Sequence, residues 1–348
     1  PTRGSLFEAT DVGLGVQSIW SRNDLHASLH GGYTDYFSVP AANTPNASGT
    51  LGGRIDASKD LTFDGEGRFT LAAQTPGSLT LPTGIVLASN QRPLYETYDA
   101  TLGGEQKFGD WGFALHGTFD RTVFQNATLG NGVIDDLASD DSNDWGLRGR
   151  ISYRMSEAVS PFVESVVDTR RYDSVIDSSG FARDSVGALG RAGATLSFSE
   201  LLSGELSGGY GERHYRDARL PDLKGPLVDA SLIWSVTPLT KVTLKTTSAL
   251  NDTVIAGASG ALTRIYSVDI SHAFLRNLTF SATGSYETDN YVGIPQTATT
   301  TNLALRADYN VTRDIMLRAS VARTDYQTNI PGQNYRADVV MLGLKLQR

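Results

Sequence analysis

The sequence predicts an all-β protein, a transmembrane antiparallel up-and-down β-barrel that forms one domain over residues 1–348. Two observations predict this fold class. Runs of about 10 to 15 residues alternate apolar and polar side chains with a period of two, which is typical of strands with one apolar and one polar face. The breaks between these runs are alternately short and long, as in a meander whose two ends differ. No run of about 18 apolar residues occurs, which excludes a transmembrane helix.

The composition supports a large β structure. Glycine is abundant, with 36 residues, whereas proline is sparse, with 12. Cysteine is absent, which excludes a disulfide framework and thiolate metal sites. The net charge of -8 argues against nucleic acid as a partner. The mean hydropathy of -0.21 is low for a membrane protein, but a barrel strand needs only one apolar face, so low averages are normal in this class.

Tight polar breaks recur along the chain and mark one end of the predicted meander, because such breaks join antiparallel strands into hairpins. They lie at residues 20–24, 58–60, 108–111, 155–158, 199–201, 237–240, 274–277 and 311–314. Longer connections with Pro, Asn and Asp clusters lie near residues 38–48, 75–93, 125–141, 174–182, 218–224, 254–259, 292–298 and 329–334. Outer-membrane barrels have short periplasmic turns and longer extracellular loops, and we expect the same arrangement here.

The alternation separates an oily face from a wet one. In one strand near the C-terminus, Ile315, Leu317 and Val321 alternate with Arg318 and Ser320. An apolar face with aromatic residues toward the strand ends suits lipid, whereas a face that carries charges along the whole strand requires water. A closed barrel satisfies every backbone group within lipid. The pattern therefore predicts an apolar outer wall and a polar lumen in a bacterial outer membrane.

The strand count suggests that one strand is missing. We count 17 alternating runs from near Val12 to Arg348. Bacterial single-chain barrels have an even number of strands. With the short turns in the periplasm, the first counted strand would begin outside the cell. We therefore expect a further strand before Pro1 and 18 strands in all, with 16 as the alternative, and residues 1–11 as a loop or tail leading from that strand.

Charged residues on the polar faces are predicted to line the lumen. They are Arg54, Glu66, Arg68, Arg148, Arg150, Arg154, Glu164, Asp168, Arg170, Lys241, Lys245, Arg306, Asp308 and Arg318. Basic and acidic side chains are nearly balanced on these faces, which argues against strong selectivity for anions or cations. The simpler interpretation is that ion pairs brace a wet lumen, and the alternative is a ladder that contacts a permeating solute. Around the turn at 58–60, we expect Arg54 opposite Glu66 and Asp56 opposite Asp64.

One predicted strand carries a basic row of Arg148, Arg150 and Arg154. Such a row inside a low-dielectric wall could guide an anionic polymer, because field lines are focused there. The next strand carries Glu164, Asp168 and Arg170. These acidic neighbours would weaken the guidance.

The segment 75–93 is unusually apolar for an exposed loop. It holds Leu79, Leu81, Ile85, Val86 and Leu87, and protein surfaces rarely leave such a cluster bare without a reason. Three interpretations stay open. The segment could fold into the barrel as a constriction, contact a partner protein or a second copy, or pack on itself.

The remaining clusters predict no catalytic, cofactor or metal site. Asp135, Asp136, Asp140, Asp141 and Asp144 lack the residue order of an EF-hand loop. A solvated loop is the preferred interpretation over loose bridging of divalent cations near lipopolysaccharide. The five histidines are scattered over different strands. An enzyme would need a Ser/His or Asp/His constellation at the extracellular rim, and we do not expect one.

Several hairpins resemble one protein family. They are GVQSIWSRNDLHASLHGGYTDY at 15–36, GRIDASKDLTFDGEGRF at 53–69, LRNLTFSATGSYE at 275–287 and VTRDIMLRASVARTDY at 311–326. These segments resemble the "putative outer-membrane β-barrel porin 2" family of proteobacteria, and the resemblance extends over nearly the whole chain. It implies an outer-membrane porin. It also implies an association with exopolysaccharide export, which is frequent in that family.

These features predict passive conduction of hydrophilic solutes or of a surface saccharide polymer through a mixed-charge lumen, without a cofactor or covalent chemistry. The alternative is a structural or assembly barrel with a plugged lumen that anchors an envelope complex. A barrel enzyme is the second alternative. The expected contacts are outer-membrane lipid and lipopolysaccharide, the permeating solute or polysaccharide, and other envelope proteins or further copies of the chain.

Overall fold

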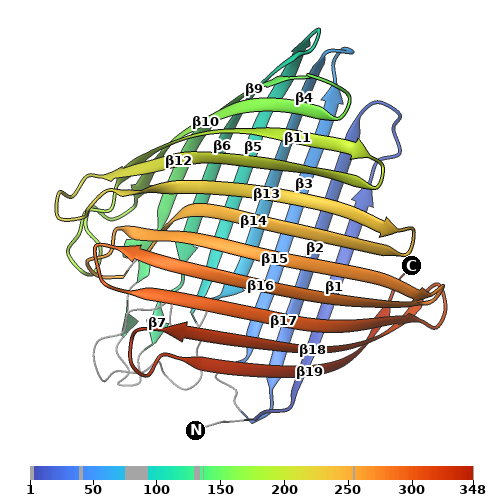
Figure 1. Ribbon diagram of the computed structural model, residues 1–348. Helices are drawn as coiled ribbons and strands as arrows, with labels where there is room; N and C mark the ends of the chain where they lie inside the picture. The colour runs from blue at the N-terminus through green and yellow to red at the C-terminus, as the bar shows by residue number, and fades with distance from the viewer. Residues whose placement is uncertain are drawn as a thin grey trace.

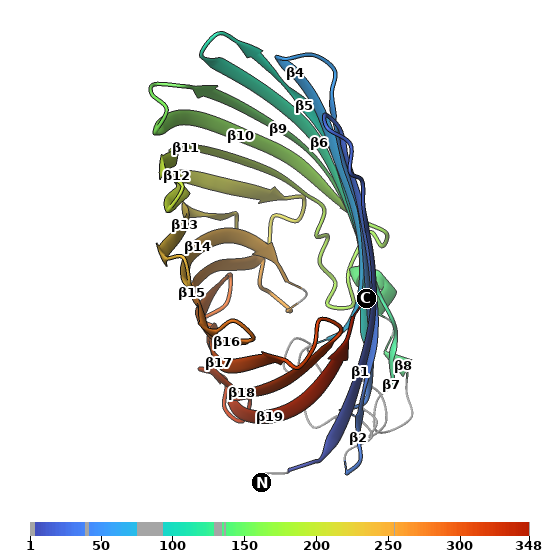
Figure 2. The ribbon, with the colours of Figure 1, turned by 90° about the vertical axis from the view of Figure 1, so that its right-hand side faces the viewer.

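A computed structural model describes residues 4–38, 42–74, 93–128, 134–135, 137–253 and 255–347. These residues contain one antiparallel sheet of 17 strands and almost no helix, which confirms the predicted fold class. Figure 1 shows the strands side by side in chain order. Figure 2 shows the sheet curled around an inner space, with β1 (Phe7–Gln17) and β19 (Tyr335–Leu346) at its edges. Among the described residues, no helix is both long and apolar enough to cross a membrane.

The other strands of the sheet are long enough to cross the apolar layer of a membrane when tilted. They are β2 (Asp24–Tyr36), β3 (Thr44–Asp56), β4 (Leu61–Ala73), β5 (Leu94–Phe108), β6 (Trp111–Phe124), β9 (Ser142–Tyr153), β10 (Val159–Tyr172), β11 (Ser185–Ser199), β12 (Leu202–Tyr215), β13 (Leu223–Thr237), β14 (Thr240–Asp252), β15 (Gly260–Leu275), β16 (Leu278–Val292), β17 (Thr297–Asn310) and β18 (Ile315–Thr328). The short strands β7 (Ala127–Thr128) and β8 (Ile134–Asp135) pair with each other after β6, and the 3-10 helix η2 (Leu137–Asp140) follows them.

Each strand of the sheet pairs antiparallel with the one before it, from β1–β2 to β18–β19. Short connections alternate with long ones, as predicted. Several short connections have only two residues, among them Gly109 and Asp110 between β5 and β6, where Gly109 has a φ of 60° that residues with a side chain rarely adopt. We call the two ends of the barrel the short-turn end and the long-loop end.

The first strand starts earlier than expected. β1 begins at Phe7, which pairs with Tyr36, so residues 7–11 belong to the sheet and are not part of a tail. The reason is that β2 offers backbone partners along its whole length, and unpaired backbone groups are costly wherever water is excluded. The expectation of a further strand before Pro1 stays a prediction.

The predicted register of the β3–β4 hairpin was wrong by two residues. Arg54 lies opposite Asp64, and Glu66 lies opposite Gly52. The turn itself lies where it was predicted: the amide of Ser58 donates to the carbonyl of Leu61 at 3.1 Å, and its hydroxyl accepts from the Leu61 amide at 3.0 Å. A turn centred on residue 59 pairs Arg54 with Asp64, so the predicted pairs assumed a centre one residue too late.

The outer wall of the sheet is apolar. Leu305, Leu317 and Val321 are 64%, 47% and 53% exposed, and Trp111 packs against Tyr153 near the short-turn end with ring centroids 4.9 Å apart. Apolar side chains exposed over so much of the surface would be unfavourable in water. They match lipid, and the aromatic pair lies where an interfacial girdle is expected.

The buried apolar residues gather toward the long-loop end. Leu220, Leu223 and Ala258 are at most 3% exposed. They come from the 216–222 connection, from the start of β13, and from the 253–259 connection. The dry part of the molecule is therefore where long loops pack together, and this packing positions the candidate site.

Candidate functional site

A chain of ion pairs crosses the inner wall from β9 to β13. Its centre is Glu164 of β10, whose side chain is 3% exposed. Arg191 of β11 lies 2.6 Å from Oε1 of Glu164, Arg150 of β9 lies 3.8 Å from Oε2, and Arg148 lies 4.0 Å from Oε1. Asp229 of β13 lies 2.6 Å from Arg191. The register places Arg150 and Arg191 on either side of Glu164, so strand pairing itself builds this chain.

Arg150 reaches further along the wall to β12. Its Nη2 donates to Oε2 of Glu205 at 2.7 Å and to Oγ1 of Thr195 at 3.1 Å. The guanidinium also stacks 3.5 Å from the ring centroid of Phe162, and Gly193 makes room for that ring, because a Cβ there would lie 2.8 Å from the Phe162 Cζ. A guanidinium held by both a carboxylate and an aromatic face has little freedom. This part of the wall is therefore rigid.

Two further ion-pair clusters lie on the inner wall. On β17 and β18, Asp308 lies 2.7 Å from Arg318 and 3.1 Å from Arg306. On β4 and β6, Asp64 lies 3.1 Å from His116 across the intervening β5. Because Asp64 and His116 belong to strands on either side of β5, their contact shows that both side chains lie on the concave face of the sheet.

The predicted cross-strand pair of Arg54 and Glu66 does not form. Arg54 lies 2.9 Å from Asp56, and Glu66 lies 2.8 Å from Arg68, so each charge finds its partner two residues along its own strand. The shifted hairpin register is the cause. These side chains are about half exposed, and pairs of this kind contribute little to stability.

The remaining basic residues of the prediction are separated from the ion-pair chain. Arg154 follows β9 in the turn at the short-turn end, where it lies 3.1 Å from Asp110. Lys245 lies opposite Ser231 and shares its face of the sheet, and Lys241 lies opposite Ser235. Neither lysine forms an ion pair within the described part of the chain. The basic row therefore consists of Arg148 and Arg150 alone, and both contact Glu164.

At the long-loop end one ion pair crosses the lumen. Arg170 of β10 lies 2.9 Å from Asp144 on the neighbouring β9 and 3.2 Å from Asp252 on β14. Three strands of the sheet separate β10 from β14. The contact between Arg170 and Asp252 therefore does not follow the wall but spans part of the inner space. Arg213 of β12 also bonds to Asp168 of β10. These contacts narrow the lumen.

Arg183 ties two long loops together. The side chain is 1% exposed, and its Nε donates to Asp177 at 2.5 Å. Its other nitrogens donate to the carbonyls of Thr253 at 2.6 Å, Ala258 at 2.9 Å and Ile255 at 3.0 Å. We call this set of contacts the loop latch. It joins the connection after β10 to the connection after β14.

A third loop packs onto the loop latch. Arg219 donates to the carbonyl of Gly180 at 2.5 Å, and Ser259 donates to the carbonyl of Pro221 at 2.5 Å. Hydrogen bonds from Arg219 hold the pKa of Asp217 well below its usual range. Figure 2 shows these loops inside the curl of the sheet. We call the described residues of the three connections together the loop cap, which comprises residues 173–184, 216–222, 253 and 255–259.

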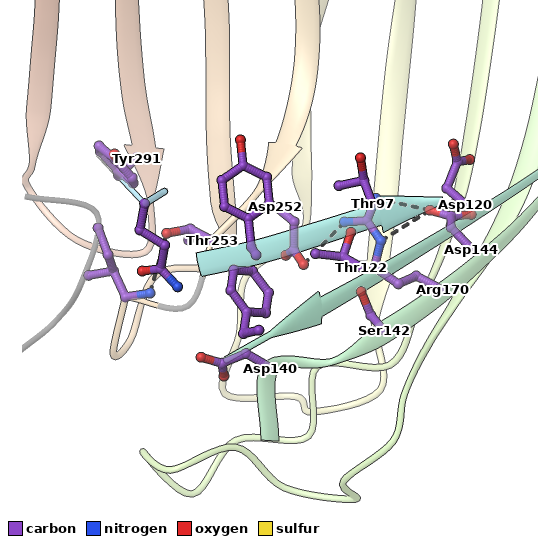
Figure 3. Close-up of a pocket in the computed structure, with 14 residues that line it drawn as sticks. Thr97, Asp120, Thr122, Asp140, Ser142, Asp144, Arg170, Asp252, Thr253 and Tyr291 are labelled. Carbon is purple, nitrogen blue, oxygen red and sulfur yellow. Dashed lines mark hydrogen bonds and ion pairs between the residues drawn. The ribbon is translucent and has the colours of Figure 1, made fainter. Parts of the chain in front are cut away.

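A cavity of about 490 Å³ lies within the lumen at the long-loop end. Its walls come from β5, β6, β9 and β10 on one side and from β14 and β16 on the other. Figure 3 shows that its charged lining consists of Asp120, Asp140, Asp144, Arg170 and Asp252. Cavities of this size accept small organic molecules, so we take this cavity as the candidate site.

Asp140 is a buried acidic residue of the cavity that lies outside the strands. It ends η2 and is 7% exposed. Burial raises the pKa of its carboxyl to about 6, and the nearby Arg183 opposes this shift. A carboxyl with such a pKa changes its charge between about pH 5 and 7.

The structure corrects the interpretation of the acidic loop as solvated. Asp140 and Asp141 are 7% and 8% exposed. Asp141 accepts a hydrogen bond from the amide of Phe124 at 2.8 Å, and Asp144 lies in β9 beside Arg170. The reason is that η2, which carries Asp140, packs against β6. The side chains of Asp135 and Asp136 lie outside the described residues.

Sequence reasoning missed the residues that narrow the lumen. These residues lie next to or within predicted loops, and they are Arg183, Asp177 and Asp252. The sequence feature that sets them apart is that they are charged residues beside connections otherwise rich in small residues. A constriction was one of three interpretations of the 75–93 segment, and it stays a prediction. Its residues Leu79, Leu81, Ile85, Val86 and Leu87 lie outside the described part of the chain.

The described residues contain no group of three or more His, Asp and Glu side chains arranged to hold a metal ion. His214 at the long-loop end lies 3.0 Å from Asp222. No serine hydroxyl of the described ranges hydrogen-bonds to this histidine. A nucleophile, base and orienting acid are thus not assembled there.

The apolar outer wall, the charged inner wall and the up-and-down sheet define an outer-membrane β-barrel. More specifically, the chain belongs to the family described as "Putative beta-barrel porin 2", whose model matches residues 2–348. This confirms the resemblance noted in the sequence. Among curated protein sequences, none matches the chain.

Two solved outer-membrane barrels illustrate the similarity of the fold. The FrpB iron transporter from Neisseria meningitidis matches with a TM-score of 0.52 and 10% identity, over 96% of this chain and 65% of that chain. The ferric enterobactin receptor PfeA from Pseudomonas aeruginosa matches with a TM-score of 0.51 and 8% identity, over 97% of this chain and 69% of that chain. This chain thus spans about two thirds of their length. At such low identity the likeness shows the fold alone.

Proposed function

We propose that this barrel is a passive pore of the outer membrane, with its long loops extracellular and its short turns periplasmic. The observation that supports it best is the charged inner wall. Arg150, Glu164 and Arg191 lie well within strands whose other face is apolar. Ionised groups at that depth require water or partners on the lumen side. A wet lumen passes hydrophilic solutes down a gradient without a cofactor or a covalent step.

The long-loop end sets the size of the permeating solute. The Arg170–Asp252 contact and the loop cap leave space for small hydrophilic molecules next to the wall. A surface saccharide polymer is the larger cargo that the proposal includes. It would need the loop latch to open, because Arg183 holds two loops together inside the curl of the sheet.

Planar-bilayer recording tests the pore. The purified full chain should insert with discrete conductance steps, and uncharged polymers of graded size should block them below a threshold size that reports the diameter. A variant lacking residues 75–93 should conduct at least as well if that segment constricts the pore. If neither protein conducts although both show the heat-modifiable mobility of folded barrels, the pore proposal is wrong.

A second candidate function is an anchor with a plugged lumen. The loop cap favours this role, because a buried guanidinium with four hydrogen-bonding partners forms a stable obstruction. An anchor would give no conductance, and its loops would resist proteolysis as well as the barrel does. Recordings of the full chain in bilayers therefore separate the two functions.

A further inference from the structure

The cavity at the long-loop end carries an excess of negative charge. Four carboxylates line it, those of Asp120, Asp140, Asp144 and Asp252, against the single guanidinium of Arg170. That guanidinium already contacts Asp144 at 2.9 Å and Asp252 at 3.2 Å. Arg170 therefore pairs with the two carboxylates that are next to it, whereas Asp120 and Asp140 form no ion pair among the described residues.

Two carboxyl groups of the cavity keep hydrogen-bonding capacity that the described residues do not fill. Asp140 is 93% buried, since its exposed fraction is 7%. Within the described ranges it forms no ion pair, and its one hydrogen bond is a long contact of 3.5 Å from Ser139. The Oδ1 atom of Asp252 is buried without any hydrogen-bond partner among the same residues. Buried polar groups are rarely left unsatisfied, so the Asp252 oxygen lacks a donor that a bound ligand could supply, and the Asp140 carboxyl can accept further hydrogen bonds.

Asp120 adds a second pair of acidic groups at the cavity. It lies directly opposite Asp99 in the β5–β6 ladder, and the two carboxyls share a side-chain hydrogen bond. Two neighbouring carboxyls that share a proton ionise fully only when a positive charge lies near them. A cation placed in the cavity would favour their ionised form and would also supply donors to Asp140 and Asp252.

The rest of the lining suits an organic cation. Tyr95, Phe124 and Tyr291 line the same cavity, and aromatic rings attract ammonium and guanidinium groups through their faces. A volume of about 490 Å³ is far larger than one metal ion needs. The described residues also contain no cluster with metal-ligand spacing.

We propose that this cavity binds a small organic cation, a primary ammonium or guanidinium compound, through Asp120, Asp140 and the free oxygen of Asp252. The carboxylates accept hydrogen bonds from its N–H groups, and the aromatic rings cover its apolar part. The inference deepens the proposed pore function and rests on it for the route by which the cation reaches the cavity. It makes the long-loop end selective for cationic solutes, although charges along the rest of the lumen are nearly balanced.

Isothermal titration of the full chain in detergent with putrescine tests the proposal, with succinate as the anion of matched length. Putrescine should bind and succinate should not. Asp140→Asn and Asp120→Asn should each weaken putrescine binding at least about tenfold, because each removes a charge-assisted hydrogen bond. The matched control Asp60→Asn removes the same charge from an exposed turn at the short-turn end and should bind like the native chain.

The same proteins are then recorded in bilayers, where putrescine should reduce the potassium current of the native chain and reduce it less in the two cavity variants. Heat-modifiable mobility establishes that each variant is folded. Equal putrescine affinity in folded Asp140→Asn, Asp120→Asn and native chains, or succinate binding as strong as that of putrescine, would overturn the cation site. Putrescine binding without any conductance would instead overturn the proposed pore and leave the binding site in place.

Discussion

Replacing Arg183 with Met should open the loop cap while the barrel stays folded. The substitution keeps much of the side-chain volume but removes the donors to Asp177 and to the carbonyls of Thr253, Ile255 and Ala258. Breaking a buried ion pair by removing one partner costs about 3–5 kcal/mol. Asp177 still accepts hydrogen bonds from two backbone amides at 2.8 Å, so we expect the lower end of this range. About 3 kcal/mol corresponds to a factor of roughly 10² in the equilibrium between closed and open loops.

Single-channel recording and limited proteolysis measure this change. Arg183→Met should give a larger conductance and faster cleavage within the loop cap, with no loss of the folded barrel on heat-modifiable gels. The control is Arg216→Met, because Arg216 is 65% exposed and lies 3.7 Å from Asp184, and exposed pairs contribute about 0–1 kcal/mol. If Arg183→Met matches the native chain in both conductance and cleavage rate, the loop latch does not control access to the lumen.

Three further predictions address the pH response, the two faces of the sheet and the inner wall. The pKa of Asp140 is raised to about 6, with Arg183, Asp177 and Asp252 around it. The preference for cations, measured as a reversal potential in a salt gradient, should therefore fall as the pH drops through about 6. Because the pKa of Asp140 is raised on folding, its neutral carboxyl stabilises the folded loop fully below pH 3.8, and this stabilisation is lost as the pH rises through about 6. A reversal potential that does not change with pH would contradict the role of Asp140 in cation preference. Leu305→Arg on the outer wall should lower the unfolding free energy in lipid vesicles by about 2–4 kcal/mol, whereas Ala304→Arg on the inner wall should change it little. Equal effects of the two substitutions would refute the assignment of Leu305 to the lipid face and of Ala304 to the lumen face. Arg150→Met should cost about 1–3 kcal/mol, because Glu205 loses a hydrogen-bond donor and Glu164 loses an ion-pair partner, and it should lower the temperature at which the folded band is lost on heat-modifiable gels. The exposed Arg68→Met should not, and similar shifts for both would show that the ion-pair chain adds no stability.

Local chemistry explains why much of the fold could be predicted. Successive side chains of a strand point to opposite faces whatever the strand pairs with, so the alternation of Leu317 and Val321 with Arg318 is sufficient to assign the two walls. Tight polar breaks likewise indicate where hairpins turn. The register depends on the exact centre of the turn. The β3–β4 ladder is centred on residue 59, which places Asp64 and not Glu66 opposite Arg54.

The sequence by itself determined the class of the protein, the 17 strands, the alternation of short and long connections and the membership in a porin family. Only the tertiary structure decided what the long-loop end does. The contact between Arg183 and Ala258 joins residues 75 positions apart, and Arg170 meets Asp252 from four strands away. A period of two is a property of neighbouring residues. It therefore carries no information about which loops turn inward or which carboxylates share a cavity, because those depend on how the whole sheet curls.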